Sequence, residues 1–248
     1  HQSHSGMSFD LSKKELDETI VRSGLAAEVE HYPVAITTTA IALGWLRQRD
    51  AAPWSVVVAD SEVSTSGRLG GDLEFIPETS VSVILRPDVA VDHQDTLWAH
   101  ALLATCAGLL AGKVSAKPWW PELAIDGREA PVGAALVKSQ LTAGRVDSSV
   151  ITIRFGPHEG PRIAPIVASL ENLRRTLIEP PAAVAETYRG QCVLKDRPVT
   201  VRRLPTGSTS GLAGSIDERG HFALRSQSMN RTSFGVDQIR SIEKRQAT

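Results

Sequence analysis

The spacing of apolar residues along the chain predicts alternating strands and helices over the first 190 positions. Nearly uninterrupted apolar runs at 54–60 and 79–86 predict strands that are buried on both faces. Apolar residues repeat with helical spacing at 10–24 and 168–179, which predicts amphipathic helices there. The other expected strands are 29–36 and 148–155, and the other expected helices are 40–50, 93–112 and 182–188.

A different pattern, of short strands separated by tight turns, begins near residue 190. Regular short strands of this kind are typical of a small SH3-like β-barrel. An earlier hairpin is expected at Asp126-Gly127, because an Asp-Gly pair between apolar segments favours a two-residue turn. The expected short strands are 191–197, 198–204, 210–217, 221–226 and 236–241.

Together these patterns predict an α+β fold with two parts. Residues 7–187 are expected to form the larger domain, and residues 188–248 the small SH3-like domain. Residues 1–6 precede Met7 and have the character of a tag remnant.

Composition and charge narrow the classes of function. Apolar residues make up 42% of the chain and charged residues 22%, which suits a globular protein with its own core. The net charge of −1 supplies no overall basic field, so neither nucleic acid nor a membrane surface is an expected partner. Two distant cysteines, Cys106 and Cys192, and the lack of a signal-peptide pattern indicate a reducing, cytoplasmic location.

Five short motifs carry the candidate chemistry. Thr37-Thr38-Thr39 follows the first expected strand, and the glycine-rich loop STSGRLGG occupies 64–71, after the second. Leu85-Arg86-Pro87 ends the third strand, WWPEL occupies 119–123, and IDERG occupies 216–220. In this order and at these spacings, the motifs resemble those of the bacterial biotin protein ligases, part of the biotin/lipoate ligase superfamily.

The resemblance implies a mixed-sheet biotin/lipoate ligase-like domain followed by the SH3-like barrel. It also implies a reaction in which biotin and ATP, with Mg²⁺, form biotinyl-adenylate. The biotinyl group then passes to a lysine of a carrier domain. The implied pocket for biotin and adenylate contains Thr37, Thr38, Thr39, Glu62, Gly67, Arg68, Gly70, Trp119, Trp120 and Gly133.

The charged positions of the family motifs are those at which this chain differs. Fixed cations neutralise the charge that develops as pyrophosphate leaves, and removing one such group commonly costs about 10²–10³ in rate. Of three arginine positions in the loop, only Arg68 still holds arginine. The replacements are Ser66 and Leu69 for loop arginines, Glu62 for a glutamine, Trp119 and Ala130 for lysines, and Glu122-Leu123 for an Asn-Asp pair.

Two main hypotheses follow. In the first, the protein is catalytically degenerate and acts as a binding or scaffolding protein, with a carrier domain, a carboxylase subunit or a second copy as partner. In the second, it is an active biotin or acyl ligase in which Arg68 and Lys117 are catalytic and Glu122 binds Mg²⁺. Further positive charge would come from Arg154, Lys113 or Lys138. An unrelated α/β protein with a barrel tail is a third option.

The two adjacent tryptophans receive separate expectations, because neighbouring residues on a strand face opposite sides. Trp120 is expected in the core, and Trp119 is expected to fill part of the nucleotide site.

Overall fold

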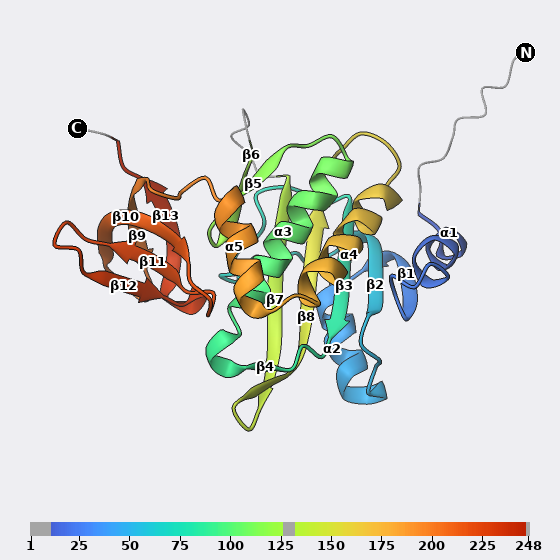
Figure 1. Ribbon diagram of the computed structural model, residues 1–248. Helices are drawn as coiled ribbons and strands as arrows, with labels where there is room; N and C mark the ends of the chain where they lie inside the picture. Colours follow the sequence, from blue (N-terminus) through green and yellow to red (C-terminus); the bar gives the residue numbers. More distant parts are fainter. Residues whose placement is uncertain (1–10, 126–131, 247–248) are drawn as a thin grey trace, which may run out of the picture.

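A six-stranded mixed sheet forms the centre of the chain within residues 11–125 and 132–246, the part that the computed structural model describes (Figure 1). The predicted turn at Asp126-Gly127 lies outside these residues. The strand order is β1-β2-β3-β8-β4, with β7 beside β8, and β1 and β2 are parallel. The strands are β1 (Glu28–Ala35), β2 (Ser55–Glu62), β3 (Thr79–Leu85), β4 (Val89–Ala90), β7 (Gly133–Thr142) and β8 (Arg145–Phe155).

Helices cover both faces of this sheet, which explains why β2 and β3 are almost entirely apolar. The helices α3 (Thr96–Ala111) and α4 (Ile163–Leu177) lie on one face, over side chains such as Val56 and Val58 (Figure 1). The helix α2 (Thr38–Arg49) covers part of the other face, over Val57. Alternate residues of one strand therefore enter two separate apolar clusters.

The close packing of α3 on the sheet depends on a small residue. A Cβ added at Gly108 would lie 2.5 Å from the ring of Phe155 on β8, so glycine sets the distance between helix and sheet.

The N-terminal helix is shorter and less regular than its pattern suggests. The helix α1 (Lys13–Leu16) continues as a π-helical turn over Asp17–Val21, and Ser12 caps it by accepting a hydrogen bond from the Glu15 N–H at 3.2 Å. Two short 3₁₀ segments, Val91–His93 and Val236–Gln238, complete the helical elements of the described residues.

Two hairpins shape the region where the candidate site lies. The strands β5 (Ala116–Trp119) and β6 (Glu122–Ile125) pair with each other in a separate two-stranded sheet. The strands β7 and β8 pair along their lengths and turn at Ala143-Gly144, both with positive φ. The sequence pattern predicted pairing across Asp126-Gly127, whereas the described parts of β6 and β7 pair with β5 and β8.

The C-terminal part is a five-stranded antiparallel sheet in the order β12-β11-β10-β9-β13, counted within the described residues. A small C-terminal β domain is therefore present, as the pattern of short strands predicted. Its strands are β9 (Pro198–Arg203), β10 (Ser208–Ile216), β11 (Phe222–Arg225), β12 (Arg231–Phe234) and β13 (Ile239–Lys244).

The prediction of a strand at 191–197 is wrong. The helix α5 (Pro181–Gln191) extends into this segment, and the predicted domain boundary near residue 188 lies within its last turn. Tyr188 holds this turn in place, because its buried ring packs edge-on against Trp120 with 5.2 Å between centroids. The strand β12 has little apolar alternation, so its pattern did not announce it.

No helix in residues 11–125 and 132–246 has both the length and the apolar character needed to cross a bilayer.

The interface between α3 and α4 contains a buried histidine, His100. Its burial predicts that the stability of the fold decreases at acidic pH. Burial lowers the pKa of His100 to about 4, and its Nδ1 lies 2.8 Å from the Thr176 hydroxyl. Between pH 6.5 and 4 the unfolded chain binds more protons at this site, so stability falls as the pH falls through this window.

Between pH 7 and pH 4.5 the wild type loses unfolding free energy at this site. We expect His100→Gln to lose about 2 kcal/mol less unfolding free energy over the same range. Urea unfolding at the two pH values measures the difference. The matched control is His93→Gln, a half-buried histidine on the 3₁₀ turn before α3. Equal losses in the wild type and in both variants would contradict the assignment.

Candidate functional site

A cavity of about 670 Å³ lies where the loop after β2, the β5–β6 hairpin, the start of β7 and the strand β13 meet. Six of the candidate catalytic, ligand-binding and metal-binding residues line it, which means that the fold brings distant motifs together. Two residues from β13, Ser241 and Ile242, also line it, although no local pattern marked them. The six are Gly67, Arg68, Trp119, Trp120, Glu122 and Gly133.

The glycine-rich loop forms a tight turn that uses its own backbone donors. The Gly67 N–H donates to the Gly71 carbonyl at 2.8 Å, and the Gly70 N–H donates to the Gly67 carbonyl at 3.1 Å. Gly70 has φ +82°, a conformation that favours glycine. Since these two amides are satisfied within the loop, they are not directed at a ligand.

Arg68 is bonded to the C-terminal domain. Its Nη1 donates to the carbonyls of Val236 at 3.2 Å and Ile239 at 2.6 Å, and its Nη2 donates to the Arg240 carbonyl at 2.8 Å. The Nε donates to Glu122 Oε1 at 3.3 Å, and the side chain is only 5% exposed. The fork of guanidinium donors is thus occupied by protein oxygens.

The remaining charges on the cavity wall are acidic. Arg68 is the single cation among the described lining residues, which also include Asp72, Glu74 and Glu122. The Glu122 side chain keeps 49% of its surface, but it lies in a concave wall with limited solvent. This desolvation raises the pKa of its carboxyl; Arg68 opposes the shift and Glu74 reinforces it.

Glu62 lies outside the cavity wall, in a buried ion pair with Arg154. The Arg154 Nε donates to Glu62 Oε1 at 2.9 Å, and the two side chains are 3% and 0% exposed. Burial opposes ionisation of Glu62, but the bonds and charge of Arg154 and the donors Ser80 and Thr38 N–H outweigh it and lower the pKa of Glu62. Arg154 also donates to the Ser66 carbonyl at 3.0 Å, so its guanidinium is bonded to protein oxygens and does not face the cavity.

This carboxylate also occupies the N terminus of α2. The Thr38 N–H donates to Glu62 Oε2 at 2.8 Å, where the helix dipole favours negative charge. Thr37 precedes the helix in an extended conformation and forms no side-chain cap. The position in which a helix N terminus could receive a ligand anion is therefore filled by the protein itself.

The hydroxyl groups of the threonine motif are bonded among themselves. Thr39 Oγ1 lies 2.6 Å from Thr152 Oγ1, and the Ser82 hydroxyl donates to Thr38 Oγ1 at 2.9 Å. Thr38 and Thr39 are 0% and 7% exposed, respectively. These hydroxyls satisfy one another in the core rather than facing the cavity.

Trp119 stands in the cavity wall without closing the cavity. Its Nε1 donates to the Ile242 carbonyl at 2.7 Å, and the Lys244 ammonium lies 5.1 Å from its ring centroid. The β13 strand thus holds the indole against the C-terminal domain, beside an open cavity. The expectation that Trp119 fills part of the nucleotide site stays a prediction.

Three further residues have clear structural positions. Trp120 is completely buried, as expected for a core residue. Gly133 lies against α3, where an added Cβ would be 2.7 Å from Leu109, so packing alone requires glycine there. Lys117 is exposed on β5 and does not belong to the described cavity wall.

Solved structures with the same architecture identify the fold. A biotin protein ligase from Aquifex aeolicus, in complex with biotin and ATP, matches with a TM-score of 0.62 and 14% identity, over 88% of this chain and 99% of that chain. The fold is that of the biotin protein ligases. A biotin protein ligase-like protein of unknown function from a Silicibacter species matches with a TM-score of 0.60 and 14% identity, over 86% and 96% of the two chains.

The biotin protein ligase fold is shared at low sequence identity throughout. A biotin acetyl coenzyme A carboxylase synthetase from Helicobacter pylori, with bound biotinylated ATP, matches with a TM-score of 0.55 and 15% identity, over 88% and 99% of the two chains. No protein-family model matches this chain, and no curated protein matches its sequence. The biotin/lipoate ligase-like fold expected from the motifs is confirmed, whereas the activity has to be argued from the site.

The Glu62–Arg154 pair predicts a large penalty for removing one partner. We expect Arg154→Met to lose about 3–5 kcal/mol of unfolding free energy at pH 7, because it leaves a buried, unpaired carboxylate. The double variant Glu62→Gln/Arg154→Met should recover most of this loss, since no charge then remains. Urea unfolding measures both.

The matched control for this pair is Arg86→Met, which breaks an ion pair with the exposed Asp50. Exposed pairs contribute only about 0–1 kcal/mol. A double variant as unstable as Arg154→Met would contradict the account of a buried charge.

The contacts of Arg68 predict that it stabilises the junction with the C-terminal domain. We expect Arg68→Ala to lower the free energy of unfolding by about 2–4 kcal/mol, because it removes charged donors from three backbone carbonyls. Amide hydrogen exchange should accelerate along 236–244 in this variant. Arg245→Ala, at an exposed arginine of the same domain, is the control, and equal effects in both variants would refute this role.

Proposed function

We propose that this protein is a biotin protein ligase-like protein with little or no adenylation activity, and that it acts as a binding or scaffolding protein. The observation that carries the proposal is the commitment of Arg68. The one arginine that remains in the glycine-rich loop uses its donors on three carbonyls of the C-terminal domain and on Glu122.

The charge of the cavity supports this proposal. A triphosphate needs fixed cations that can follow the negative charge moving onto pyrophosphate. The described cavity wall offers three carboxylates and one guanidinium that is already bonded. Binding ATP in this cavity would place its phosphates beside like-charged carboxylates, which would weaken binding.

The donors expected for magnesium fit poorly as well. Glu122, the candidate ligand, already accepts a hydrogen bond from the Arg68 Nε at 3.3 Å, so the guanidinium charge stands beside the carboxylate that would hold Mg²⁺. Within the described residues, no group of three or more His, Cys, Asp or Glu side chains is arranged to hold a metal ion. We therefore derive no catalytic step through a magnesium ion.

The alternative function is an active ATP-dependent biotin or acyl ligase. The observation that favours it is the cavity itself, whose 670 Å³ is within the usual range of about 300–1,000 Å³ for small-molecule sites. In this alternative Arg68 and Lys117 act on the phosphate and carboxylate, and Glu122 holds Mg²⁺. Lys117 would have to move from its exposed position on β5, and Arg68 would have to leave its carbonyl partners.

The scaffolding proposal leaves the partner to be chosen among a carrier domain, a carboxylase subunit and a second copy of the chain. We propose that the five-stranded C-terminal sheet is an SH3-like barrel that contributes to this binding. A homodimer through the edge strand β1 is less favoured, because Pro33 lacks the N–H that pairing requires. The two unbridged, buried cysteines fit a cytoplasmic location.

Pyrophosphate release tests the proposal directly. We expect no release above the blank when ATP is supplied with biotin, lipoate or octanoate, because the only cation among the described lining residues, Arg68, is already bonded to protein oxygens. An active biotin protein ligase, assayed alongside, shows that the conditions support turnover. Calorimetry should likewise detect no ATP binding.

The variant Arg68→Ala separates true turnover from contamination, provided that circular dichroism shows it folded at the assay temperature. Robust release by the wild type that Arg68→Ala abolishes would reject the degenerate protein in favour of the active ligase.

A further inference from the structure

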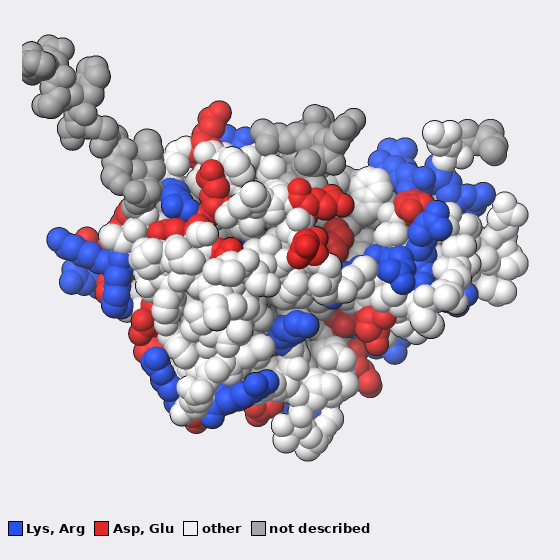
Figure 2. Space-filling model, turned by 180° about the vertical axis from the view of Figure 1, so that it is seen from behind, with Lys and Arg blue, Asp and Glu red and all other residues white. Residues whose placement is uncertain are grey.

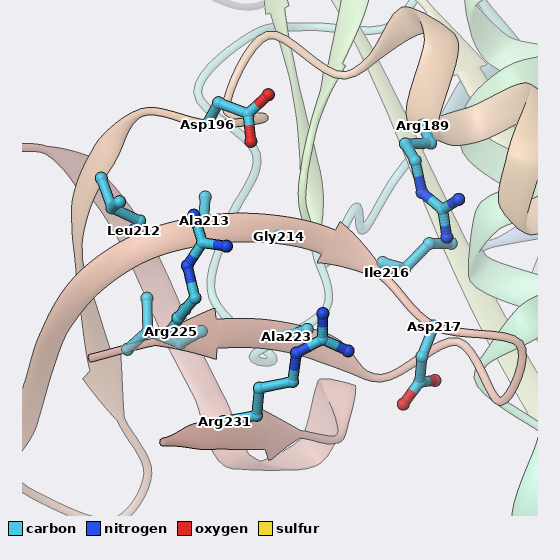
Figure 3. A pocket seen from close by; sticks show the side chains of 11 residues that line it. Arg189, Asp196, Leu212, Ala213, Gly214, Ile216, Asp217, Ala223, Arg225 and Arg231 are labelled. Carbon is cyan, nitrogen blue, oxygen red and sulfur yellow. The ribbon is translucent and has the colours of Figure 1, made fainter. Parts of the chain in front are cut away.

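A second hollow, of about 420 Å³, lies on the C-terminal domain and shares no lining residue with the cavity described above. We refer to it as the arginine groove. Its floor is formed by β10 and β11, and Arg189 enters from α5 (Figure 3). Arg225 on β11 and Arg231 on β12 complete its cationic lining.

The three arginines of this groove lack side-chain partners in the part of the chain that the structure describes. None of the guanidinium groups of Arg189, Arg225 and Arg231 forms a hydrogen bond or ion pair with the described residues. Two other arginines of the domain do have acidic partners: Arg202 pairs with Glu243 at 2.8 Å, and Arg219 lies 3.9 Å from Asp217. The groove is therefore lined by three arginines that no described carboxylate engages directly.

Two of these arginines face each other across a strand pair. Arg225 and Arg231 are directly opposite in the β11–β12 register, so their side chains leave the same face of the sheet. Like charges in this position destabilise a strand pair. An anion placed between them would relieve the repulsion, which gives the groove a physical preference for negatively charged ligands.

The whole C-terminal region is basic, although the chain is close to neutral. Residues 188–248 contain 11 Lys or Arg and 5 Asp or Glu, a net charge of +6, while residues 1–187 have a net charge of −7. Figure 2 shows basic side chains gathered over this domain, on the right of that view. The overall charge of −1 hides this asymmetry, which is typical of a domain that meets an acidic partner.

The floor of the groove is low enough for the backbone of a bound ligand to come close to β10 and β11. Gly214 on β10 is exposed, and Ala223 lies beside it on β11, so no large side chain covers the strands between the arginines. A glycine in a strand often marks a place where another backbone comes near. Figure 3 shows the arginine side chains around this low floor.

Two carboxylates at the margins narrow the class of ligand. Asp217 accepts hydrogen bonds from the N–H groups of Arg219 and His221 and belongs to its own turn, and Asp196 is exposed at the end of the groove. These acids interrupt the cationic track that a phosphodiester backbone would follow. Both phenylalanines of the described domain, Phe222 and Phe234, are buried, so they offer no surface for stacking bases.

We propose that the arginine groove binds an acidic segment of a partner protein, with the carboxylates of that segment on Arg225, Arg231 and Arg189. This site is separate from the cavity, and it does not depend on whether the protein retains adenylation activity. It gives a scaffolding protein a defined contact surface.

Fluorescence anisotropy with a labelled Glu decapeptide tests the proposal on the full chain. We expect saturable binding in 50 mM salt, no binding of a Gln decapeptide, and weaker binding in 300 mM salt because the contacts are exposed ion pairs. The double variant Arg225→Glu/Arg231→Glu should weaken binding by about tenfold or more.

The matched control is Arg245→Glu, which reverses the charge of an exposed arginine of the same domain outside the groove. It should leave binding within about twofold of the wild type. If the charge reversals impair folding, Arg225→Gln/Arg231→Gln serves the same purpose without introducing acids.

Three results would overturn the proposal. The first is that the Glu decapeptide does not bind, and the second is that the groove and control variants weaken it equally. The third is that an oligonucleotide of ten thymidines binds more tightly through the same arginines. Sedimentation adds a further check, since concentration-dependent dimerisation that disappears in the double variant would assign the groove to a second copy of the chain.

Discussion

The guanidinium of Arg68 connects parts of the structure that share no strand pairing. It extends from the loop after β2 and donates to backbone carbonyls at 236–240, while its Nε reaches Glu122 on the β5–β6 hairpin. Arginine suits this task because its planar fork presents several donors in fixed directions. The shape of the cavity depends on these bonds, since the loop, the hairpin and β13 form its walls.

The same bonds explain why the cavity and the chemistry of the biotin protein ligase fold separate in this chain. A guanidinium that satisfies several carbonyls is a structural group, and it would have to break those bonds before it could stabilise a departing phosphate. Burial and neighbouring Glu74 raise the pKa of Glu122, while Arg68 opposes the shift and holds its carboxylate. The fold has been kept, but its polar atoms are used to hold the protein together.

The pair of Glu62 and Arg154 also uses charged atoms to hold the protein together, and both of its side chains are buried. The acid caps α2 through the Thr38 N–H, and the arginine connects β8 to the loop through the Ser66 carbonyl. A buried pair of this kind contributes to specificity only if both partners stay, because either charge alone is costly. Arg225 and Arg231, which lie opposite each other on β11 and β12, have no acidic partner of this kind among the described residues.

The sequence by itself determined the elements whose signals are local. Apolar runs marked β2, β3 and α3, helical spacing marked α4, and the order of the motifs indicated the fold. Only the tertiary structure decided where the charges point. Arg154 meets Glu62 across 92 positions, and Arg68 meets the C-terminal carbonyls across 168 to 172. Tyr188 packs edge-on against Trp120 at the end of α5, just before the segment 191–197 that was wrongly predicted to be a strand. Such pairings arise from the packing of whole elements, which local periodicity does not encode.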